Sequence, residues 1–448
     1  MGKYFGTDGI RGVAGEELDA ELAFKAGRAA ATVLTQAAGK QPNVMIARDT
    51  RISCDMLEAA LTAGLCSSGA NVTLMGVLPT PAVAYLTVKT QADMGVVISA
   101  SHNPFDHNGI KMFGRNGYKL SDALEDRIEQ YIDDDSAICR ASGEELGRIN
   151  IEHEYWTKEY VKFLASASEG QYKGRIIIDC ANGAASETAR LLFRQLNAQF
   201  EIISDEPDGV NINANCGSTH LDTLRDIMKT GRFSVGFAFD GDADRCLVVD
   251  ERSETVDGDM LLAVLARDMR ATGRLKGGGM VGTVVSNSGM EHFARDNGFV
   301  FHRAAVGDRN VLEMMRDIEC NLGGESSGHL IFSDDATTGD GQLTAIKFLN
   351  LLIATGKSVS ELVDDIPRFP QVMPSYKLTG GAAERDAIMA DPRLLAEIER
   401  QQAILADNGR ILIRPSGTEP IIRVLVEAET EALALDIAGL LIKTIESL

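Results

Sequence analysis

Positive charge is scarce in this sequence. Its 448 residues include 44 Lys and Arg against 65 Asp and Glu, which gives a formal net charge of −21 at pH 7. A protein of this charge repels polyanions, so the composition argues against nucleic acid and anionic membranes as partners. If the ligand is itself a phosphate, a few cations must create a local positive site within a negative protein.

Long apolar runs are also missing. No stretch of about 18 or more consecutive apolar residues occurs, so we expect no membrane span. The first residues, MGKYFG, lack the apolar core of a secretion signal. We therefore expect a cytoplasmic protein.

Paired cysteines are absent as well. The sequence has seven scattered cysteines and no C-x-x-C motif. This set is typical of reduced cytosolic thiols, and it argues against a disulfide framework and against a zinc site. The cysteines are Cys54, Cys66, Cys139, Cys180, Cys216, Cys246 and Cys320.

Strand-like and helix-like segments alternate along most of the chain. Strands are predicted at 43–47, 71–75, 94–99, 175–179, 233–240, 246–250, 280–285 and 300–302. Helices are predicted at 17–38, 56–68, 122–132, 153–167, 186–196, 260–269, 341–354 and 393–408. Such alternation indicates an α/β fold with mostly parallel sheets covered on both faces.

Polar residues follow several of the predicted strands, at Ser101, Asn182, Asp240 and Asn287. Ligands of parallel α/β folds bind where strands end, so we expect repeated α/β units around one central cleft. A polar segment at 134–150 and a proline cluster near 366–376 are candidate boundaries. The order of elements after the second boundary predicts a small α+β domain.

Three aspartates alternate along the run 240–245 (DGDADR). Oxygen ligands at every second position suit a hard divalent cation, with magnesium the favoured ion. Asp240, Asp242 and Asp244 also match the start of an EF-hand loop. However, Arg245 stands where that loop needs glycine, and the flanking residues are strand-like. A solvated acidic turn is the other alternative.

A second candidate site lies at residues 98–104 (ISASHNP). Ser101 stands on a tight polar turn, and its hydroxyl could carry a phosphoryl group held by the same cation. The alternatives are an ordinary strand-to-turn sequence and Ser99 as the nucleophile, although Ser99 is better placed to support the turn. No G-x-S-x-G motif surrounds either serine, which argues against a hydrolase triad.

Two cations in the first part of the chain could neutralise a phosphate. Arg11 lies in the glycine-rich run 6–12 (GTDGIRG), where the backbone can approach a ligand closely; a flexible N-terminus is the alternative. Lys111 follows the serine turn and could also move a proton, although a lysine taken alone is more often a surface residue.

Two later loops carry groups that bind phosphates and sugars. Residues 414–420 (RPSGTEP), with Arg423 beyond them, combine arginine, hydroxyls and free amides as a phosphate cradle requires. They lack the lysine and spacing of a P-loop, and a polar hairpin turn is the alternative. Residues 323–329 (GGESSGH) could read sugar hydroxyls or an amine, although an isolated His329 would more often be structural.

Taken in order from Gly6 to Arg423, the serine, acidic, sugar and phosphate loops resemble those of the α-D-phosphohexomutase family. The resemblance implies a phosphoserine enzyme with one Mg²⁺ per subunit. This enzyme isomerises a small sugar phosphate through a 1,6-bisphosphate. The resemblance also implies three related α/β domains with mostly parallel mixed sheets, plus a C-terminal α+β domain, around a central cleft. We place these domains at 1–150, 151–252, 253–368 and 369–448.

The same resemblance implies roles for individual residues. Ser101 carries the phosphoryl group, and the metal is held by Ser101, Asp240, Asp242 and Asp244. Phosphoryl and proton transfer are supported by Arg11, His102, Lys111 and Arg245. The substrate is bound by Glu325, Ser327, His329, Arg414, Ser416, Gly417, Thr418 and Arg423.

Within the family, residues 6–12, 215–220, 306–309 and 337–341 resemble members that act on glucosamine phosphates. We therefore expect interconversion of glucosamine 6-phosphate and glucosamine 1-phosphate through glucosamine 1,6-bisphosphate, which feeds UDP-N-acetylglucosamine and cell-wall synthesis. Asn310 departs from the family, where tyrosine commonly follows Asp-Arg. Glucose and mannose phosphates are the alternative substrates, and a catalytically silent sugar-phosphate-binding regulator is the alternative from another class. A homodimer is compatible with the sequence.

Overall fold

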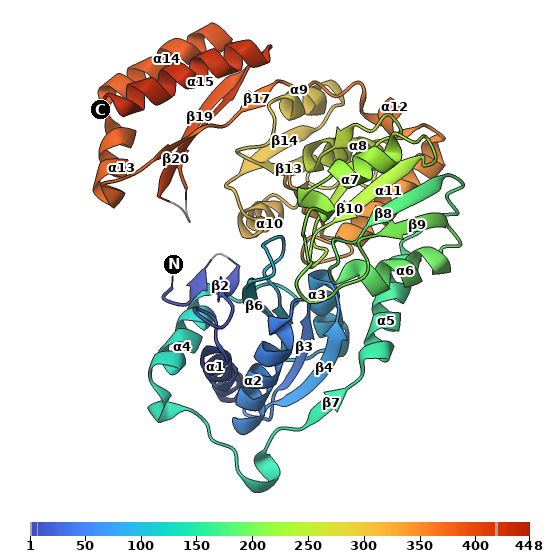
Figure 1. Cartoon of the computed structure of the whole chain (residues 1–448), viewed down its shortest axis with the longest axis vertical. Coiled ribbons are helices and arrows are strands. Elements are labelled where there is room, and N and C mark those ends of the chain that lie inside the picture. Colours follow the sequence, from blue (N-terminus) through green and yellow to red (C-terminus); the bar gives the residue numbers. More distant parts are fainter. Residues whose placement is uncertain (1, 7, 417–419) are drawn as a thin grey trace.

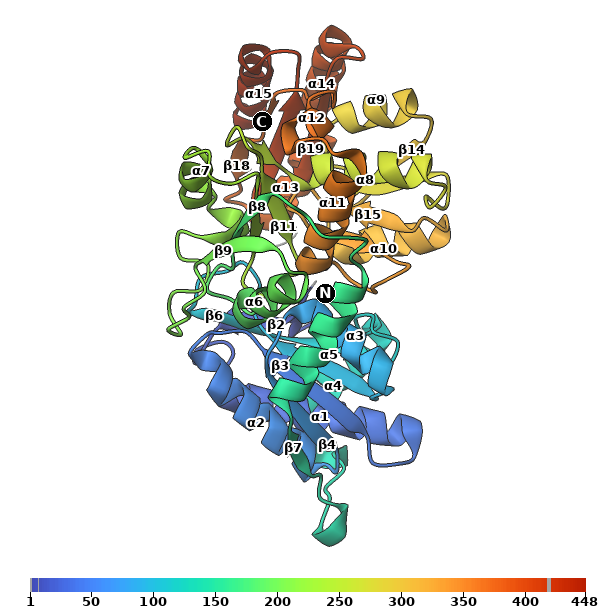
Figure 2. The ribbon, with the colours of Figure 1, turned by 90° about the vertical axis from the view of Figure 1, so that its right-hand side faces the viewer.

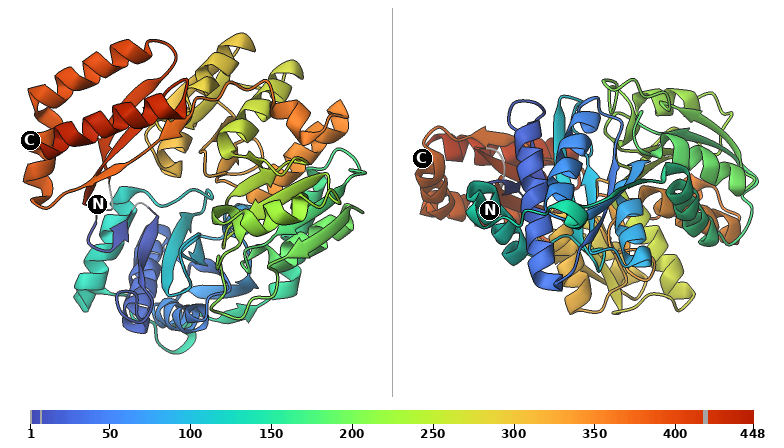
Figure 3. Two further views of the ribbon diagram at one scale, coloured as in Figure 1. Left: turned by 45° about the horizontal axis from the view of Figure 1, so that its top comes forward. Right: turned by 90° about the horizontal axis from the view of Figure 1, so that it is seen from below.

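The fold is described from a computed structural model, which describes residues 2–6, 8–416 and 420–448. The chain forms four units, each built on its own β-sheet. In Figure 1 the first three units follow one another from blue to orange, and the C-terminal unit lies beside the N-terminal one. Two further views show the same neighbours (Figure 3).

The first unit contains a seven-stranded sheet with strand order β1-β2-β6-β5-β3-β4-β7. Its strands are β1 (Phe5–Gly6), β2 (Gly9–Val13), β3 (Asn43–Arg48), β4 (Asn71–Val77), β5 (Met94–Ile98), β6 (His107–Gly114) and β7 (Ile149–Ile151). β5, β3, β4 and β7 are parallel, whereas β6, β2 and β1 form an antiparallel edge. The helices are α1 (Ala20–Ala38), α2 (Ser53–Ser67), α3 (Thr80–Thr90) and α4 (Asp122–Asp133), with short 3₁₀ turns at Asp135–Ala137 and Gly143–Glu145.

The second unit contains a five-stranded sheet with order β12-β11-β10-β8-β9. Its strands are β8 (Arg175–Asp179), β9 (Gln199–Ile203), β10 (Val235–Phe239), β11 (Cys246–Val249) and β12 (Thr255–Val256). β9, β8 and β10 are parallel, and β11 and β12 continue the sheet in antiparallel fashion. The helices are α5 (His153–Ser166), α6 (Ala185–Gln195) and α7 (Asp222–Met228), with a 3₁₀ turn at Gly217–Thr219.

The third unit contains a four-stranded sheet with order β14-β13-β15-β16, in which only β16 is antiparallel among the described strands. Its strands are β13 (Gly279–Thr283), β14 (Val300–Ala304), β15 (Leu322–Gly324) and β16 (Leu330–Phe332). Its helices are α8 (Gly258–Ala271), α9 (Gly289–Asp296), α10 (Asp308–Asp317), α11 (Gly341–Thr355) and α12 (Val359–Val363).

The C-terminal unit contains an antiparallel sheet in which β20 pairs with the other three strands. Its strands are β17 (Gln371–Val372), β18 (Ser375–Lys377), β19 (Arg410–Pro415) and β20 (Ile421–Glu427). Its helices are α13 (Gly381–Ala390), α14 (Pro392–Leu405) and α15 (Glu431–Glu446).

One hydrophobic core runs through the second and third units and into the first. It contains Phe113 of β6, Phe237 of β10 and Phe348 of α11, and the last two rings meet edge to face at 6.4 Å. Helix α5 packs against α3 and α6 and so lies between the first two units (Figure 2). The C-terminal unit has a separate core. The first three units therefore form one continuous body, to which the last unit is attached.

A polar joint attaches the C-terminal unit to the third one. Arg410 of β19 donates to Val284 O (2.7 Å) and Ser286 O (2.5 Å) in the loop after β13. Glu427 of β20 pairs with Arg410 (2.9 Å) and accepts from the N–H of Ser288 (2.9 Å). Because the Glu427 side chain is fully buried, these bonds fix the base of the β19–β20 hairpin.

Each predicted helix and strand is present, with ends that differ by a few residues, and the predicted α/β class is confirmed. Three elements near the site, β6, α3 and α10, are not among the predicted ones. β6 begins with a polar sequence but is buried in the sheet, and it carries Lys111 into the interior. Among the described residues, no helix has the length and apolar character needed to cross a bilayer.

Candidate active site

Ser101 lies on the turn between β5 and β6. Its backbone adopts the left-handed region (φ +53°), and its N–H donates to Ser99 Oγ over 2.9 Å, so Ser99 supports the turn. The Ser101 hydroxyl donates to Asp240 Oδ2 at 2.7 Å, although the two residues are 139 positions apart in sequence. The fold thus joins the serine loop of the first unit to the acidic loop of the second.

The acidic loop follows β10 and is buried. One carboxylate oxygen from each of Asp240, Asp242 and Asp244 lies within 4.8 Å of the others. Burial and the carboxylates of the other two raise the pKa of Asp240 to about 8. The flanking elements are β10 and β11, which form an antiparallel pair, so the EF-hand alternative is wrong. The same burial excludes a solvated turn.

The acidic loop fits a magnesium ion. Asp242 Oδ1 and Asp244 Oδ1 are buried, and neither has a hydrogen-bond partner in the described part of the chain. Unpaired buried carboxylate oxygens are costly unless a cation neutralises them. Hard oxygen donors of this kind are the ligands that Mg²⁺ prefers.

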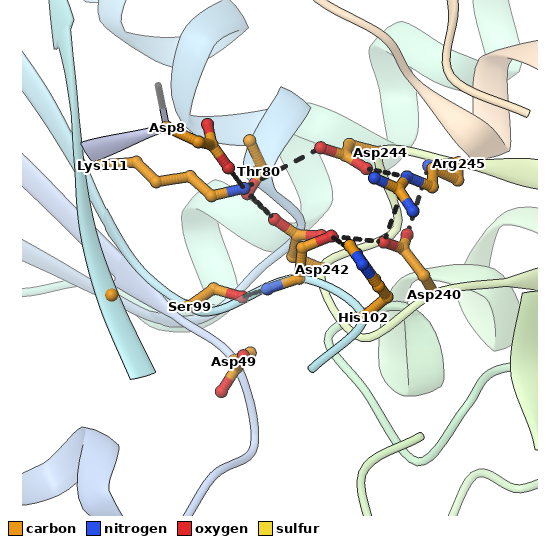
Figure 4. Close-up of polar contacts among 12 residues, drawn as sticks. Asp8, Asp49, Thr80, Ser99, His102, Lys111, Asp240, Asp242, Asp244 and Arg245 are labelled. Atoms are coloured by element: carbon orange, nitrogen blue, oxygen red, sulfur yellow. Dashed lines mark hydrogen bonds and ion pairs between the residues drawn. The ribbon is translucent and has the colours of Figure 1, made fainter. Parts of the chain in front are cut away.

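Lys111 of β6 is buried and points toward the three aspartates of the acidic loop (Figure 4). The alternative that Lys111 is a surface lysine is therefore wrong. Its Nζ lies 2.7 Å from Asp242 Oδ2 and 3.2 Å from Asp8 Oδ2. Burial alone would lower the pKa of Lys111, but Asp242 and Asp8 raise it above its usual value. Thr80 at the start of α3 donates to the same Asp242 oxygen at 2.6 Å.

Arg11 of β2 forms an ion pair with Asp8, which lies in the predicted glycine-rich run. Asp8 also pairs with Lys119 (2.5 Å), and Lys119 pairs with Asp308 at the start of α10 (2.7 Å). These pairs connect the first unit to the third. Asp8, Lys119 and Asp308 are not among the predicted site residues, although Asp8 lies in the run 6–12 and Asp308 in the run 306–309. Thr7 lies outside the described residues.

His102 and Arg245 flank the contact between the two loops. His102 Nδ1 lies 3.2 Å from Ser101 Oγ. Burial, followed by the charges of Arg245 and Arg11, lowers the pKa of His102 to about 4, so the ring is neutral at pH 7. The guanidinium of Arg245 lies 3.9 Å from carboxylate oxygens of both Asp240 and Asp244, and the backbone N–H of Arg245 donates to Asp240 Oδ1.

The predicted sugar loop lies between β15 and β16. Its Glu325 carboxylate accepts from the N–H of Gly307 (3.0 Å), and Ser327 Oγ donates to the other oxygen of Glu325 at 3.4 Å. His329 Nδ1 lies 3.6 Å from Asp244 Oδ2, and His329 Nε2 accepts from the N–H of Gly339. The sugar loop is therefore brought to the metal loop by His329.

The predicted phosphate cradle is at the tip of the β19–β20 hairpin. Arg414 and Arg423 are paired across the two strands, and the N–H of Ser416 donates to Ile421 O at 2.9 Å. Burial and the Arg423 charge lower the pKa of Arg414. The hairpin extends from the C-terminal sheet toward β2 (Figure 1). The labelled side chains around the acidic loop in Figure 4 all come from the first two units, so none of them belongs to this hairpin. Gly417 and Thr418 lie outside the described residues.

Comparison with known proteins assigns the family. Models of phosphoglucomutase/phosphomannomutase match the chain as alpha/beta/alpha domain I (residues 2–138), domain II (158–254), domain III (257–369) and C-terminal domain (378–443). The chain belongs to this family of phosphohexomutases, which confirms the predicted family.

More specific relatives match over the whole length. A phosphoglucosamine mutase from Shouchella clausii is 46% identical over 447 residues, covering 100% of this chain and 99% of that protein. A solved phosphoglucomutase/phosphomannomutase family protein from Burkholderia thailandensis aligns with TM-score 0.82 and 25% identity over 98% of this chain and 97% of that one. N-acetylphosphoglucosamine mutase from Aspergillus fumigatus, in complex with GlcNAc-6P and magnesium, shares the fold (TM-score 0.67, 18% identity, 95% and 96% covered).

Proposed function

We propose that the chain is a phosphoglucosamine mutase, which interconverts glucosamine 6-phosphate and glucosamine 1-phosphate. The observation that carries the proposal is the 2.7 Å hydrogen bond between Ser101 Oγ and Asp240, because it joins a nucleophilic hydroxyl to a metal-binding loop. Full-length identity of 46% to a protein of that name supports the amino sugar as substrate. The product would feed the synthesis of UDP-N-acetylglucosamine and cell-wall precursors.

The reaction begins with a phosphoryl group on Ser101 Oγ. A sugar hydroxyl attacks the phosphorus and the bond between phosphorus and Oγ breaks. The neutral His102 ring, whose Nδ1 lies 3.2 Å from Oγ, can accept the hydroxyl proton and pass it to the released Ser101 oxygen. The resulting glucosamine 1,6-bisphosphate turns over in the site and returns its other phosphoryl group to Ser101. The phosphoserine is thereby regenerated and no phosphate is consumed.

The charged residues divide between holding a metal and neutralising phosphate. Asp240, Asp242 and Asp244, with an oxygen of the Ser101 phosphoryl group, would hold one Mg²⁺, which supplies charge neutralisation for the transferring group. The carboxylates around Lys111 keep this lysine protonated. We therefore assign Lys111, like Arg11 and Arg245, to binding phosphoryl oxygens rather than to removing a proton.

The remaining predicted residues bind the parts of the substrate that do not react. Glu325, Ser327 and His329 would contact the sugar hydroxyls and the amine. Arg414, Ser416, Gly417, Thr418 and Arg423 would hold the distal phosphate. Arginine and backbone amides bind a phosphate in several orientations, which suits a cradle that must hold the phosphate at either end of the bisphosphate.

We further propose domain boundaries at 150, 252 and 368. The first lies within β7 of the first sheet, the second precedes β12, which is the edge strand of the second sheet, and the third lies between α12 and β17. A cytoplasmic location and a homodimer remain predictions from the sequence.

The test of the proposed function is Ser101→Ala. Intact mass should show a phosphate on the wild type that is missing from the variant, and the variant should lose turnover of glucosamine 6-phosphate. Full activity of the variant would refute the proposal. Assays with glucose and mannose phosphates should give slower turnover; a faster rate would assign one of those activities instead. A protein that binds sugar phosphate but carries no phosphoserine would be the silent regulator.

A further inference from the structure

Arg51 uses every one of its donors although its side chain is completely buried. The Nε–H donates to Asp49 Oδ2 (2.8 Å), so the charge is paired within the first unit. The four Nη–H groups donate to backbone carbonyls of the serine loop. Those acceptors are Ser101 O (3.0 Å), Asn103 O (2.9 Å), Pro104 O and His107 O (3.0 Å).

A second side chain holds the same turn from the opposite unit. Asn213 Nδ2 donates to Ser101 O at 2.9 Å and to Asn103 O at 3.1 Å. These are the two carbonyls that Arg51 Nη2 also contacts. We call Arg51 and Asn213 the carbonyl clamp. The two sides of the clamp come from different units, so the position of the serine loop depends on how these units are joined.

The junction beside the clamp is closely packed. Thr50 Oγ1 donates to Asn182 O (2.6 Å), which fixes the residue before Arg51 onto the second unit. Gly241, within the acidic loop, approaches so closely that a Cβ on it would lie 2.5 Å from Ser101 O. The carbonyl of Ser101 is therefore confined by two donors and by the metal loop itself.

This confinement explains how Ser101 keeps an unfavourable backbone. A serine with φ of +53° costs free energy unless the surrounding structure compensates. The carbonyl oxygens of the turn accept hydrogen bonds from one guanidinium, and these bonds stabilise the left-handed backbone conformation of Ser101. The conformation in turn directs the hydroxyl toward Asp240.

We infer that Arg51 is a positioning residue for phosphoryl transfer, acting with Asn213 by holding the backbone of Ser101 in the geometry that presents Oγ to the metal loop. The inference rests on the proposed function, since it gives Arg51 a role in the same transfer. A residue that only filled the core would need neither a charge nor five directed donors. Lysine could not replace Arg51, because its three donors cannot reach all four carbonyls and Asp49.

The test compares Arg51→Lys with Arg267→Lys. Arg267 is the control because its guanidinium, like that of Arg51, bridges a carboxylate and backbone, here Asp365 and the Leu362 carbonyl, but it lies on α8 of the third unit and does not contact the serine loop. We expect Arg51→Lys to lower kcat about 100-fold with KM for glucosamine 6-phosphate changed less than about twofold, since displacement of a reacting group by about 1 Å has this effect. Arg267→Lys should retain wild-type kcat.

A second variant keeps the inference falsifiable if Arg51→Lys does not fold. Asn213→Ala removes the other half of the clamp and leaves the ion pair of Arg51 intact, and we expect about a tenfold loss of kcat at unchanged KM. Single-turnover transfer from phosphorylated Ser101 should slow by the same factor in each variant. Wild-type kcat in a folded clamp variant, or a change in KM alone, would overturn the inference.

Ser101→Ala, measured in parallel, separates the two proposals. If Ser101→Ala is inactive while both clamp variants turn over normally, only the positioning role fails. If Ser101→Ala itself is fully active, the proposed function fails.

Discussion

The polar joint between the third and C-terminal units can be broken by one substitution, Arg410→Met. The methionine keeps most of the aliphatic length but removes the donors to Val284 O, Ser286 O and Glu427. The Glu427 carboxylate then stays buried, and of its contacts described above only the N–H of Ser288 remains. Removing one partner of a buried ion pair costs about 3–5 kcal/mol. Because 19% of the Arg410 side chain is exposed, we expect the lower end, about 3 kcal/mol.

The functional effect should appear in substrate binding. Arg414 lies four residues beyond Arg410 on β19, which corresponds to about 13 Å along an extended strand. A tilt of about 10° at the joint would therefore move Arg414 by about 2 Å. We expect KM for glucosamine 6-phosphate to rise about tenfold, with a smaller change in the single-turnover rate at Ser101.

Calorimetry is the appropriate assay of stability, because the single tryptophan, Trp156, lies in α5 and reports on the second unit. Arg400→Met is the matched control, since it removes an exposed ion pair with Glu397 that is worth at most about 1 kcal/mol. The double variant Arg410→Met/Glu427→Met should recover part of the lost stability. Wild-type melting and wild-type KM for Arg410→Met would refute the assignment of this joint.

The metal loop, the charged cluster and the third unit each give a further test. Chelation by EDTA should abolish turnover and added Mg²⁺ should restore it; full activity after chelation would contradict the metal site. Lys119→Met removes the cation between Asp8 and Asp308, so kcat/KM should fall about tenfold, while the exposed control Lys158→Met should leave it unchanged. Burial raises the pKa of Asp259 from its usual 3.8 to about 6, so the folded state binds the proton more tightly and wild-type stability should fall as pH rises through this range. Asp259→Asn removes this pH dependence and should be more stable than wild type by up to about 3 kcal/mol above pH 7, but by much less at pH 4. If the melting temperatures of variant and wild type differ by the same amount at both pH values, the raised pKa of Asp259 is contradicted.

The acidic loop could be located from sequence because its signal is local. The predicted strand at 233–240 contains the apolar run of β10 (Val235–Phe239), and three alternating carboxylates follow that run at once. Strand and ligand loop are then both visible within about ten residues. The serine turn could be located from the sequence equally well, because the Asn-Pro pair that follows Ser101 and His102 is typical of a turn.

Strand β6 and the carbonyl clamp could not be found in this way. β6 buries Asn108 and Lys111, so its polar residues conceal the apolar pattern that identifies a strand. Arg51 stands before a helix in an ordinary polar context, and its acceptors on the serine loop lie 50 to 56 positions away. Such roles depend on tertiary packing, which no local pattern contains.

The buried cluster also accounts for how a protein of net charge −21 can bind an anionic substrate. Lys111 is held in the interior by Asp242 and Asp8, and the partly buried Lys119 pairs with Asp8 and Asp308, so the cations that would bind phosphate are already engaged in ion pairs. An incoming phosphate must compete with these carboxylates for the lysines. A divalent cation at the acidic loop would take over the charge of Asp242 and leave Lys111 available to the phosphate. We therefore expect metal and sugar phosphate to strengthen each other's binding, and a chelated enzyme whose affinity for glucosamine 6-phosphate is unchanged would contradict this coupling.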